Sequence, residues 1–264
     1  MSLQGVDTEG GAYQTPEELW SAVENDPRGK ENGWYKAAVQ YWDKQEASYN
    51  GVLGGFGHVS DADITESQKF LKKAFAKPLL EASSGKRRLV ALDCGAGVGR
   101  VSEQLLLHHF HEVDLLEPSG HLLETARKKL CGGGPKPFPS SHHAVNFMQM
   151  GLQEFAPTEP RYDVLWIQWS LLYLTDDDAV ALFERSRAGL KPDGIIVVKE
   201  NICKSGFVVD KEDSSLTRSN AYMLKLFEWS NLTLLYNTAQ RNFPKNLFQV
   251  RMYALKHKPL PGSQ

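Results

Sequence analysis

The sequence predicts an α/β fold in which a mostly parallel, seven-stranded sheet is flanked by helices and preceded by a helical N-terminal extension. Two observations lead to this prediction. Apolar runs of strand length alternate with segments whose apolar residues have helical spacing, as in parallel strands joined by crossover helices. The chain has 264 residues, 41% of them hydrophobic and 23% charged, which suits one globular domain with a large core.

The N-terminal part is expected to be an extension followed by a cap over the core. Residues 1–15 are small and polar, and we expect them to be mobile, within a partly flexible extension of residues 1–33. A helix is expected to start at Pro16. Within residues 34–80 we expect a helical cap and a glycine-rich segment, NGVLGGFGH at 50–58, which forms either a lid over a ligand or an ordinary turn.

The segment LVALDCGAGVGR, residues 89–100, predicts a cofactor site. Its apolar start indicates a buried strand, which Asp93 ends. Three glycines follow at alternate positions, where only glycine tolerates positive φ and lets the backbone approach a ligand closely. These glycines are Gly95, Gly97 and Gly99. Residues 100–109 have helical spacing, so the N-terminus of a helix would point at the ligand.

The spacing of the glycines indicates which class of cofactor the turn binds. A dinucleotide-binding turn would need glycine at position 100, where the chain has Arg100. The pattern D-x-G-x-G-x-G instead resembles the first motif of class I S-adenosylmethionine-dependent methyltransferases. The amino-acid end of that cofactor carries an ammonium and a carboxylate. Asp93 would orient the turn or approach the ammonium, and Arg100 would pair with the carboxylate.

Glu117 ends the second expected strand, within HEVDLLEPS at 111–119. An acid about 20 residues after a glycine turn is placed to accept hydrogen bonds from ribose hydroxyls. The alternative is that Glu117 caps the next helix, with Pro118 in its first turn. The two roles are compatible.

The rest of the chain continues the alternation of strands and helices. A helix is expected at 175–190, capped by Thr175 with aspartates at its positive end. The last two strands are expected to form an antiparallel pair. The five remaining strands are expected at residues 145–150, within 161–169, and at 194–201, 232–238 and 248–255.

Three segments that follow strands carry polar or aromatic candidates for ligand contacts. In MGLQEF, residues 150–155, backbone groups and Gln153 or Glu154 would meet an adenine. In residues 167–174, Gln168 and Trp169 stand at the end of a strand, although the tryptophan is as consistent with packing. Residues 199–215 carry four acids, which form either a solvated face or a site for a cationic substrate. These acids are Glu200, Asp210, Glu212 and Asp213.

Several motifs together resemble the eukaryotic protein N-terminal (α-N) methyltransferases. They are YWDKQ with NGVLGGFGH, LDCGAGVGR, WIQW, and GIIVVKEN followed by VVDKEDSS. The resemblance runs from about residue 34 to residue 255. It implies a class I methyltransferase, Rossmann-like core over residues 81–264, with a substrate-binding insertion near 202–216. It also implies S-adenosylmethionine as cofactor, no metal, and methyl transfer to the α-amine of proteins whose processed N-terminus reads X-Pro-Lys.

The resemblance also implies roles for individual residues. Those on the cofactor side are Trp42, Val52, Gly95, Arg100, Glu117, Leu152 and Gln168, and the segments discussed above add Gly97 and Gln153. Those on the substrate side are Leu53, Trp169, Asn201, Asp210, Asp213, Ser215 and Phe248. Those in catalysis are Asp213, Tyr173 and Asn201.

The implied reaction needs an acceptor for one proton. An α-amine has a pKa of about 7.7–8.0, and only its neutral form can attack a methyl sulfonium. Asp213 is the first candidate acceptor; its alternative role is to anchor the amine by charge. Tyr173 stands where the family usually has histidine, and a tyrosine with a pKa of about 10 is a poor base, so it is expected to hydrogen-bond or shape the pocket. Phe248 replaces a frequent tyrosine, which removes one hydroxyl from the peptide groove.

Composition narrows the class of protein further. The net charge of −2 argues against binding to nucleic acid by bulk electrostatics, and no apolar run reaches membrane-spanning length. Three scattered cysteines and the histidines around position 109 suggest neither a metal site nor disulfides, so we expect an intracellular protein. The family resemblance implies a location in nucleus and cytoplasm and protein substrates with X-Pro-Lys N-termini, and we expect a monomer.

Two other functions remain open from the sequence. One is a class I methyltransferase that acts on a small amine or metabolite. The other is an inactive regulatory protein that binds the cofactor, which the departures at Tyr173 and Phe248 suggest.

Overall fold

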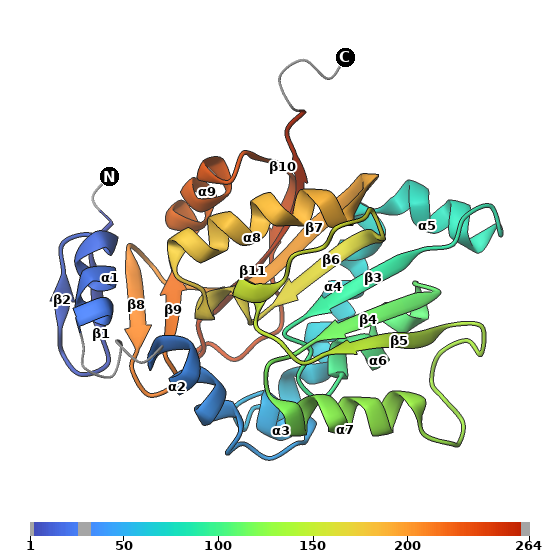
Figure 1. The fold of residues 1–264 in the computed structure, drawn as a ribbon, viewed down its shortest axis with the longest axis horizontal. Coiled ribbons are helices and arrows are strands. Elements are labelled where there is room, and N and C mark those ends of the chain that lie inside the picture. Colours follow the sequence, from blue (N-terminus) through green and yellow to red (C-terminus); the bar gives the residue numbers. More distant parts are fainter. Residues whose placement is uncertain (1–2, 26–32, 260–264) are drawn as a thin grey trace.

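The centre of the computed structural model, which describes residues 3–25 and 33–259, is a seven-stranded sheet with the order β10-β11-β7-β6-β3-β4-β5 (Figure 1). The pairs β3–β4, β3–β6, β4–β5 and β6–β7 are parallel, whereas β11 is antiparallel to both β7 and β10. The predicted mostly parallel α/β sheet is confirmed. Its strands are β3 (Val90–Cys94), β4 (Glu112–Leu116), β5 (His143–Met148), β6 (Tyr162–Gln168), β7 (Leu190–Ile202), β10 (Leu232–Ala239) and β11 (Gln249–His257).

Helices cover both faces of this sheet, because alternate strand residues point to opposite sides and both sides are apolar. In β3, Leu92 and Cys94 join one buried cluster and Ala91 joins the other. The α-helices are α1 (Pro16–Asn25), α2 (Gly33–Trp42), α3 (Tyr49–Val52), α4 (Ser60–Ala74), α5 (Ala76–Ser83), α6 (Arg100–Gln104), α7 (Gly120–Cys131), α8 (Asp176–Gly189) and α9 (Asn220–Trp229). Short 3₁₀ turns are η2 (Gly57–Val59), η3 (Leu106–His108), η4 (Leu152–Glu154) and η5 (Leu171–Tyr173).

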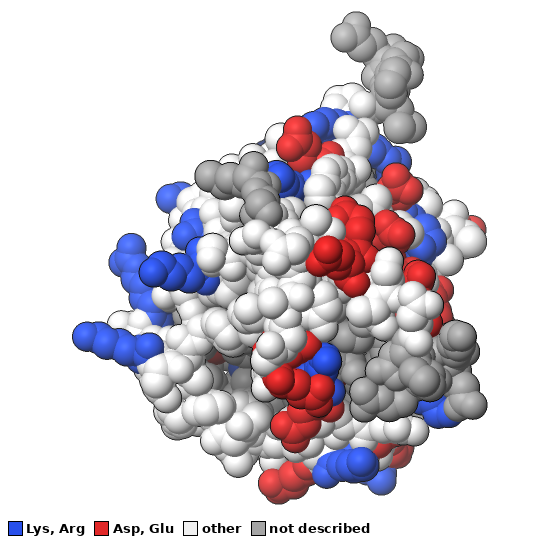
Figure 2. Space-filling view, turned by 90° about the vertical axis from the view of Figure 1, so that its left-hand side faces the viewer, with Lys and Arg blue, Asp and Glu red and all other residues white. Residues whose placement is uncertain are grey.

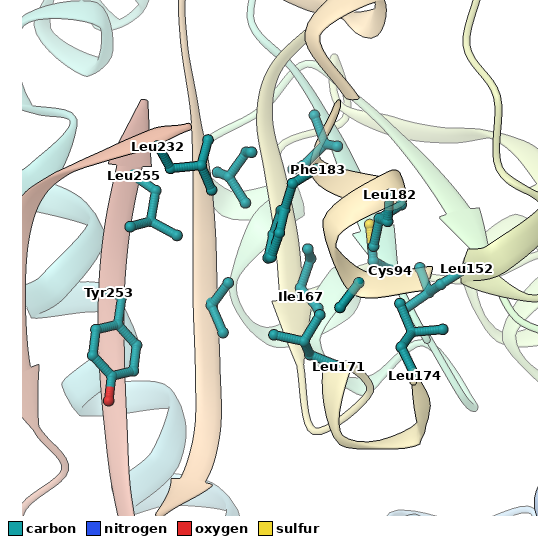
Figure 3. Close-up of a cluster of buried hydrophobic side chains, with 14 of the residues drawn as sticks. Cys94, Leu152, Ile167, Leu171, Leu174, Leu182, Phe183, Leu232, Tyr253 and Leu255 are labelled. Carbon is teal, nitrogen blue, oxygen red and sulfur yellow. The ribbon is translucent and has the colours of Figure 1, made fainter. Parts of the chain in front are cut away.

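The cluster on the α8 and α9 side is shown in Figure 3. Ile167 from β6, Phe183 from α8 and Tyr253 from β11 contribute to it, and each is at most 1% exposed. Leu171, on the turn that follows β6, belongs to the same cluster. This packing fixes the turn η5 relative to the sheet, and η5 carries residues of the cavity described below.

The neighbouring strands β3 and β6 mark the point where the strand order reverses, since β4 and β5 follow on one side and β7 on the other. In open α/β sheets a crevice forms at this point, beyond the carboxyl ends of the strands. The glycine turn after β3 and the residues after β6 therefore lie at one edge of the sheet.

The N-terminal residues form a second, four-stranded sheet with the order β2-β1-β8-β9. Strand β1 (Gly5–Asp7) pairs with β2 (Ala12–Tyr13) and runs parallel to β8 (Phe207–Asp210), which forms a hairpin with β9 (Ser215–Arg218). Figure 1 shows these N-terminal strands beside β8. Residues 1–15 were expected to be mobile, but residues 5–13 form a hairpin: β1 pairs with the backbone edge of β8, and β2 pairs with β1. Composition does not reveal such an edge.

The remainder of the N-terminal extension packs through aromatic side chains. The predicted helix start at Pro16 is confirmed by α1. Trp20 Nε1 donates to Asp176 Oδ2 at 2.7 Å, and the Trp20 and Trp34 rings meet edge to face with centroids 5.4 Å apart. Residues 26–32 of the predicted flexible extension lie outside the described residues. None of the helices in the two described ranges is long and apolar enough to cross a membrane.

Candidate active site

A cavity with about 960 Å³ of open space lies where the carboxyl ends of β3, β4 and β6 meet the cap helices α2 and α3. All nine residues predicted for the cofactor line it, and so do three predicted for substrate or catalysis. The first set is Trp42, Val52, Gly95, Gly97, Arg100, Glu117, Leu152, Gln153 and Gln168, and the second is Leu53, Trp169 and Tyr173.

The glycine turn after β3 adopts the left-handed conformation that its sequence predicts. The φ angles of Gly95, Gly97 and Gly99 are 74°, 53° and 74°. A Cβ atom on Gly95 would lie 2.4 Å from Ser170 Cβ, so the turn also needs glycine for close packing. The amides of Gly95 and Ala96 donate to Leu116 O at 2.8 and 3.0 Å. These bonds tie the turn to the end of β4.

Asp93 lies under this turn and does not line the cavity. Ser102 Oγ donates to its Oδ2 at 2.7 Å, and burial raises the pKa of Asp93 to about 6. Of the two roles considered for Asp93, the structure therefore supports orientation of the turn.

Glu117, at the end of β4, is 7% exposed and lines the cavity. Its Oε2 accepts from Gly97 N and its Oε1 from Ser119 N, both at 2.9 Å. Ser119 is the residue that caps α7, so Glu117 supports both the glycine turn and the start of that helix. Burial raises the pKa of Glu117 to about 7. A carboxylate has about four lone-pair positions, so two remain for hydroxyl donors.

Asp63, on α4, is the shared partner of side chains that line or support the cavity wall. Its carboxylate is 2.8 Å from Arg100 Nη2 and forms an ion pair with Lys199. Gln168 Nε2 donates to both oxygens of Asp63, at 2.9 and 3.0 Å. Burial acts to raise the pKa of Asp63, but Lys199 and Arg100 outweigh it and the pKa lies below its ordinary value. Asp63 thus fixes the guanidinium and the amide that face the cavity.

Asp63 and Lys199 were not among the predicted site residues. The available signal was the position of Asp63 on the buried face of an amphipathic helix, where Ser60, Asp63, Ser67 and Phe70 recur at helical spacing. A carboxylate is almost never buried without a partner, so this position alone indicates a cation on a facing element. Which cation it would be could not be read from the helix.

Trp169 follows β6 and has a φ angle of 52°, unusual for a residue with a large side chain. Its Nε1 donates to Asn201 Oδ1 at 3.2 Å, and the Arg100 guanidinium lies 5.7 Å from its ring centroid. Phe243 stacks on the indole with centroids 6.5 Å apart. Asn201 therefore contacts a cavity residue, although it does not itself line the cavity. Phe243 was not among the predicted site residues.

Tyr173 connects the cavity with the β8–β9 hairpin. Its hydroxyl donates to Asp213 Oδ2 at 3.1 Å, and Trp34 Nε1 donates to its backbone oxygen at 2.7 Å. Burial raises the pKa of Tyr173 well above 10, so this side chain is a donor and not a base near neutral pH. Burial also raises the pKa of Asp213, against the opposing effects of Ser215 and Tyr173.

The β8–β9 hairpin brings three of the predicted substrate residues together. Asp210 and Ser215 are opposed in the strand register, and Asp213 lies in the turn between them. Phe248 is separate: it is 45% exposed and is not part of the cavity lining. Phe243 stacks on Trp169 and Phe248 is not its partner. In residues 3–25 and 33–259, no group of three or more His, Cys, Asp or Glu side chains could hold a metal ion.

The chain is similar to several known proteins. A family model described as AdoMet dependent proline di-methyltransferase matches residues 30–256. The Alpha N-terminal protein methyltransferase 1 of Arabidopsis thaliana is 46% identical over 256 residues, 97% of this chain and 91% of that protein. The N-terminal Xaa-Pro-Lys N-methyltransferase 1-B of Xenopus laevis is 37% identical over 86% of this chain and 96% of that protein.

A solved structure of a SAM-dependent methyltransferase from Leishmania major superposes with a TM-score of 0.83, at 38% identity and over 97% of both chains. Fold, cavity and comparisons together define an S-adenosylmethionine-dependent methyltransferase with the class I fold. The chain belongs to the AdoMet dependent proline di-methyltransferase family.

Proposed function

We propose that this enzyme methylates the α-amine of proteins whose N-terminus reads X-Pro-Lys. The names of the Arabidopsis and Xenopus relatives support this substrate class. The observation that carries the proposal is the hydrogen bond from Tyr173 to Asp213, which joins the cavity to an acidic hairpin turn. An amine that enters between the cavity and the hairpin turn would meet the Asp213 carboxylate beside the methyl donor.

The cavity residues fit S-adenosylmethionine. Glu117 has acceptor positions left for two ribose hydroxyls, and the Arg100 guanidinium can pair with the carboxylate of the amino-acid end. Leu152 and Gln153 line the part of the wall that follows β5, and Trp42 and Val52 cover it from α2 and α3. When bound, the cofactor supplies an electrophilic methyl group on its sulfonium.

Gln168 has a more restricted role in this proposal than the family resemblance implies. Its Nε2 is engaged by Asp63, and its Oε1 accepts from Trp166 Nε1 at 2.9 Å. The amide therefore shapes the wall and offers the cofactor at most one free lone pair.

On the substrate side, Asp213 would take the proton from the α-ammonium. Its raised pKa brings the carboxylate closer to the pKa of the amine, about 7.7–8.0, and makes it a better base than an exposed aspartate. Tyr173 would hold the carboxylate in place by donating to it. Asn201 would hold Trp169 for the proline, beside Leu53, and Asp210 with Ser215 would receive the lysine. Phe248 lies outside this arrangement.

Short peptides test the proposal directly. Incubated with enzyme and S-adenosylmethionine, an X-Pro-Lys peptide is expected to gain methyl groups on its α-amine, as measured by mass spectrometry with fragmentation. The same peptide with an acetylated N-terminus should gain none, and X-Pro-Gln should react more slowly because it lacks the cation. Transfer to a small amine with inert peptides, or cofactor binding without any transfer, would contradict the proposal.

Cofactor binding is expected to release a proton at Glu117. The pKa of about 7 in the free enzyme leaves this carboxyl partly protonated near neutral pH, with Asp93 and Asp43 adding to the effect of burial. Hydroxyl donors favour the ionised form and lower the pKa in the complex. The affinity for S-adenosylhomocysteine should therefore rise as pH increases from about 6 to 7 and level off above.

Calorimetry in two buffers with different ionisation enthalpies measures this proton release. The Glu117→Gln variant is the control, because it keeps the size of the side chain but cannot titrate. We expect this variant to bind S-adenosylhomocysteine about 10- to 100-fold more weakly, because it loses charged hydrogen bonds, and we expect its affinity not to depend on pH. An unchanged pH dependence in this variant would assign the proton to another group.

A further inference from the structure

The acidic segment, residues 210–213, contains one cation. Its sequence is Asp-Lys-Glu-Asp, so Lys211 stands directly beside Asp210 and two residues from Asp213. A free ammonium at this place would compete with the lysine of a substrate for the same carboxylates. The structure instead places Lys211 Nζ 3.0 Å from Asp7 Oδ2 and 3.2 Å from Glu9 Oε2.

Asp7 and Glu9 belong to the N-terminal hairpin, residues 5–13. This hairpin holds Lys211 through its backbone as well as its charges. Thr8 N donates to Val209 O at 3.0 Å, and Lys211 N donates to Thr8 Oγ1 at 3.2 Å. These two bonds therefore fix the position of Lys211 relative to the hairpin.

Asp7 is a buried, ionised residue of the hairpin. Its side chain is fully buried and accepts from Gly11 N at 2.6 Å, Glu9 N at 3.0 Å and Tyr13 Oη at 2.8 Å. Burial acts to raise the pKa of Asp7, but the bonds from Lys211 and Tyr13 outweigh it and bring the pKa to about 2. A Cβ atom on Gly11 would lie 2.4 Å from Asp7 Oδ2, so this arrangement also needs glycine there.

We propose that the N-terminal hairpin increases the affinity for a cationic substrate: Asp7 and Glu9 hold the Lys211 ammonium, so that Asp210 and Asp213 stay available to the substrate lysine. This inference rests on the proposed function. Figure 2 looks onto the side of the molecule that carries the hairpin and shows Asp and Glu side chains gathered in groups, with Lys or Arg side chains beside them. The hairpin precedes residue 30, where the match to the family model begins.

The test compares full-length variants in a charge cycle: Asp7→Asn/Glu9→Gln, Lys211→Gln, and the triple variant. With an X-Pro-Lys peptide we expect the double variant to raise KM about three- to tenfold, the size expected for one screened charge interaction. The kcat and the affinity for S-adenosylhomocysteine should stay within about twofold, because none of these residues lines the cofactor cavity. The triple variant should return KM to near the wild-type value, because the freed cation is absent.

Two controls separate charge from hairpin order. Thr8→Ala removes the bond to Lys211 N without a change of charge and should leave KM nearly unchanged, and KM for X-Pro-Gln should not respond to the double variant. An unchanged KM in the double variant, or a KM that stays high in the triple variant, would overturn this inference alone. A wild-type enzyme that does not methylate X-Pro-Lys at all would overturn the proposed function and this inference with it.

Discussion

Replacing Asp213 with asparagine is expected to reduce methyl transfer to an X-Pro-Lys peptide by at least about 100-fold, the usual effect of losing a proton acceptor. Asparagine has nearly the same shape but cannot take the proton, and most of the α-amine is protonated at neutral pH. Binding of S-adenosylhomocysteine should survive, because Asp213 does not line the cofactor cavity. Single-turnover assays combined with calorimetry measure the two effects separately.

Tyr173→Phe is the matched control for this prediction. It removes the hydrogen bond to Asp213 but leaves the carboxylate, and a tyrosine with a raised pKa has no proton-accepting role to lose. We expect less than a tenfold loss of kcat, the cost of one hydrogen bond. Retained turnover in Asp213→Asn would contradict the assignment of Asp213 as the base. An equal loss in both variants would show that activity depends on the hydrogen bond between Tyr173 and Asp213 and not on proton transfer to Asp213.

The Asp63→Ala variant is expected to lose about 3–5 kcal/mol of unfolding free energy, the cost of leaving a buried charge without its partner. Two cations depend on Asp63: Lys199, with a fully buried side chain, and Arg100, whose side chain is 4% exposed. Gln168 also loses the acceptor that orients its amide. Urea unfolding measures the loss, and weaker binding of S-adenosylhomocysteine should accompany it because Arg100 and Gln168 line the cavity.

Asp193→Ala provides the comparison for Asp63. Asp193 also pairs with an arginine, Arg87, but its side chain is 53% exposed. A pair of this kind contributes about 0–1 kcal/mol. Equal losses in the two variants would show that the buried network is no more important for folding than a surface pair.

The glycine turn and the acid that ends β4 could be located from the sequence because their signal is local. The glycine positions and Glu117 are separated by short, regular distances along the chain, and the strand and helix between them fix where they meet. All nine residues expected around the cofactor line the cavity. The antiparallel pair β10–β11 could likewise be predicted, from two apolar runs near the end of the sequence.

Contacts between distant segments could not be predicted in this way. Lys199 and Asp63 are 136 residues apart, and either could have paired with many other charges. The N-terminal hairpin depends on backbone pairing with β8, for which its small and polar side chains carry no pattern. Phe243 and Phe248 both lie in the loop between β10 and β11, and only the path of the backbone places Phe243 against Trp169.

The left-handed backbone at Trp169 has a consequence for how the protein can vary. A bulky residue in this conformation costs on the order of 1–3 kcal/mol, which a glycine would avoid. The indole nevertheless occupies the position, in contact with Asn201, Arg100 and Phe243. Selection for stability therefore favours replacement of Trp169, whereas selection for the site favours keeping it. Screens for thermostable variants should recover substitutions at this residue that disturb the site.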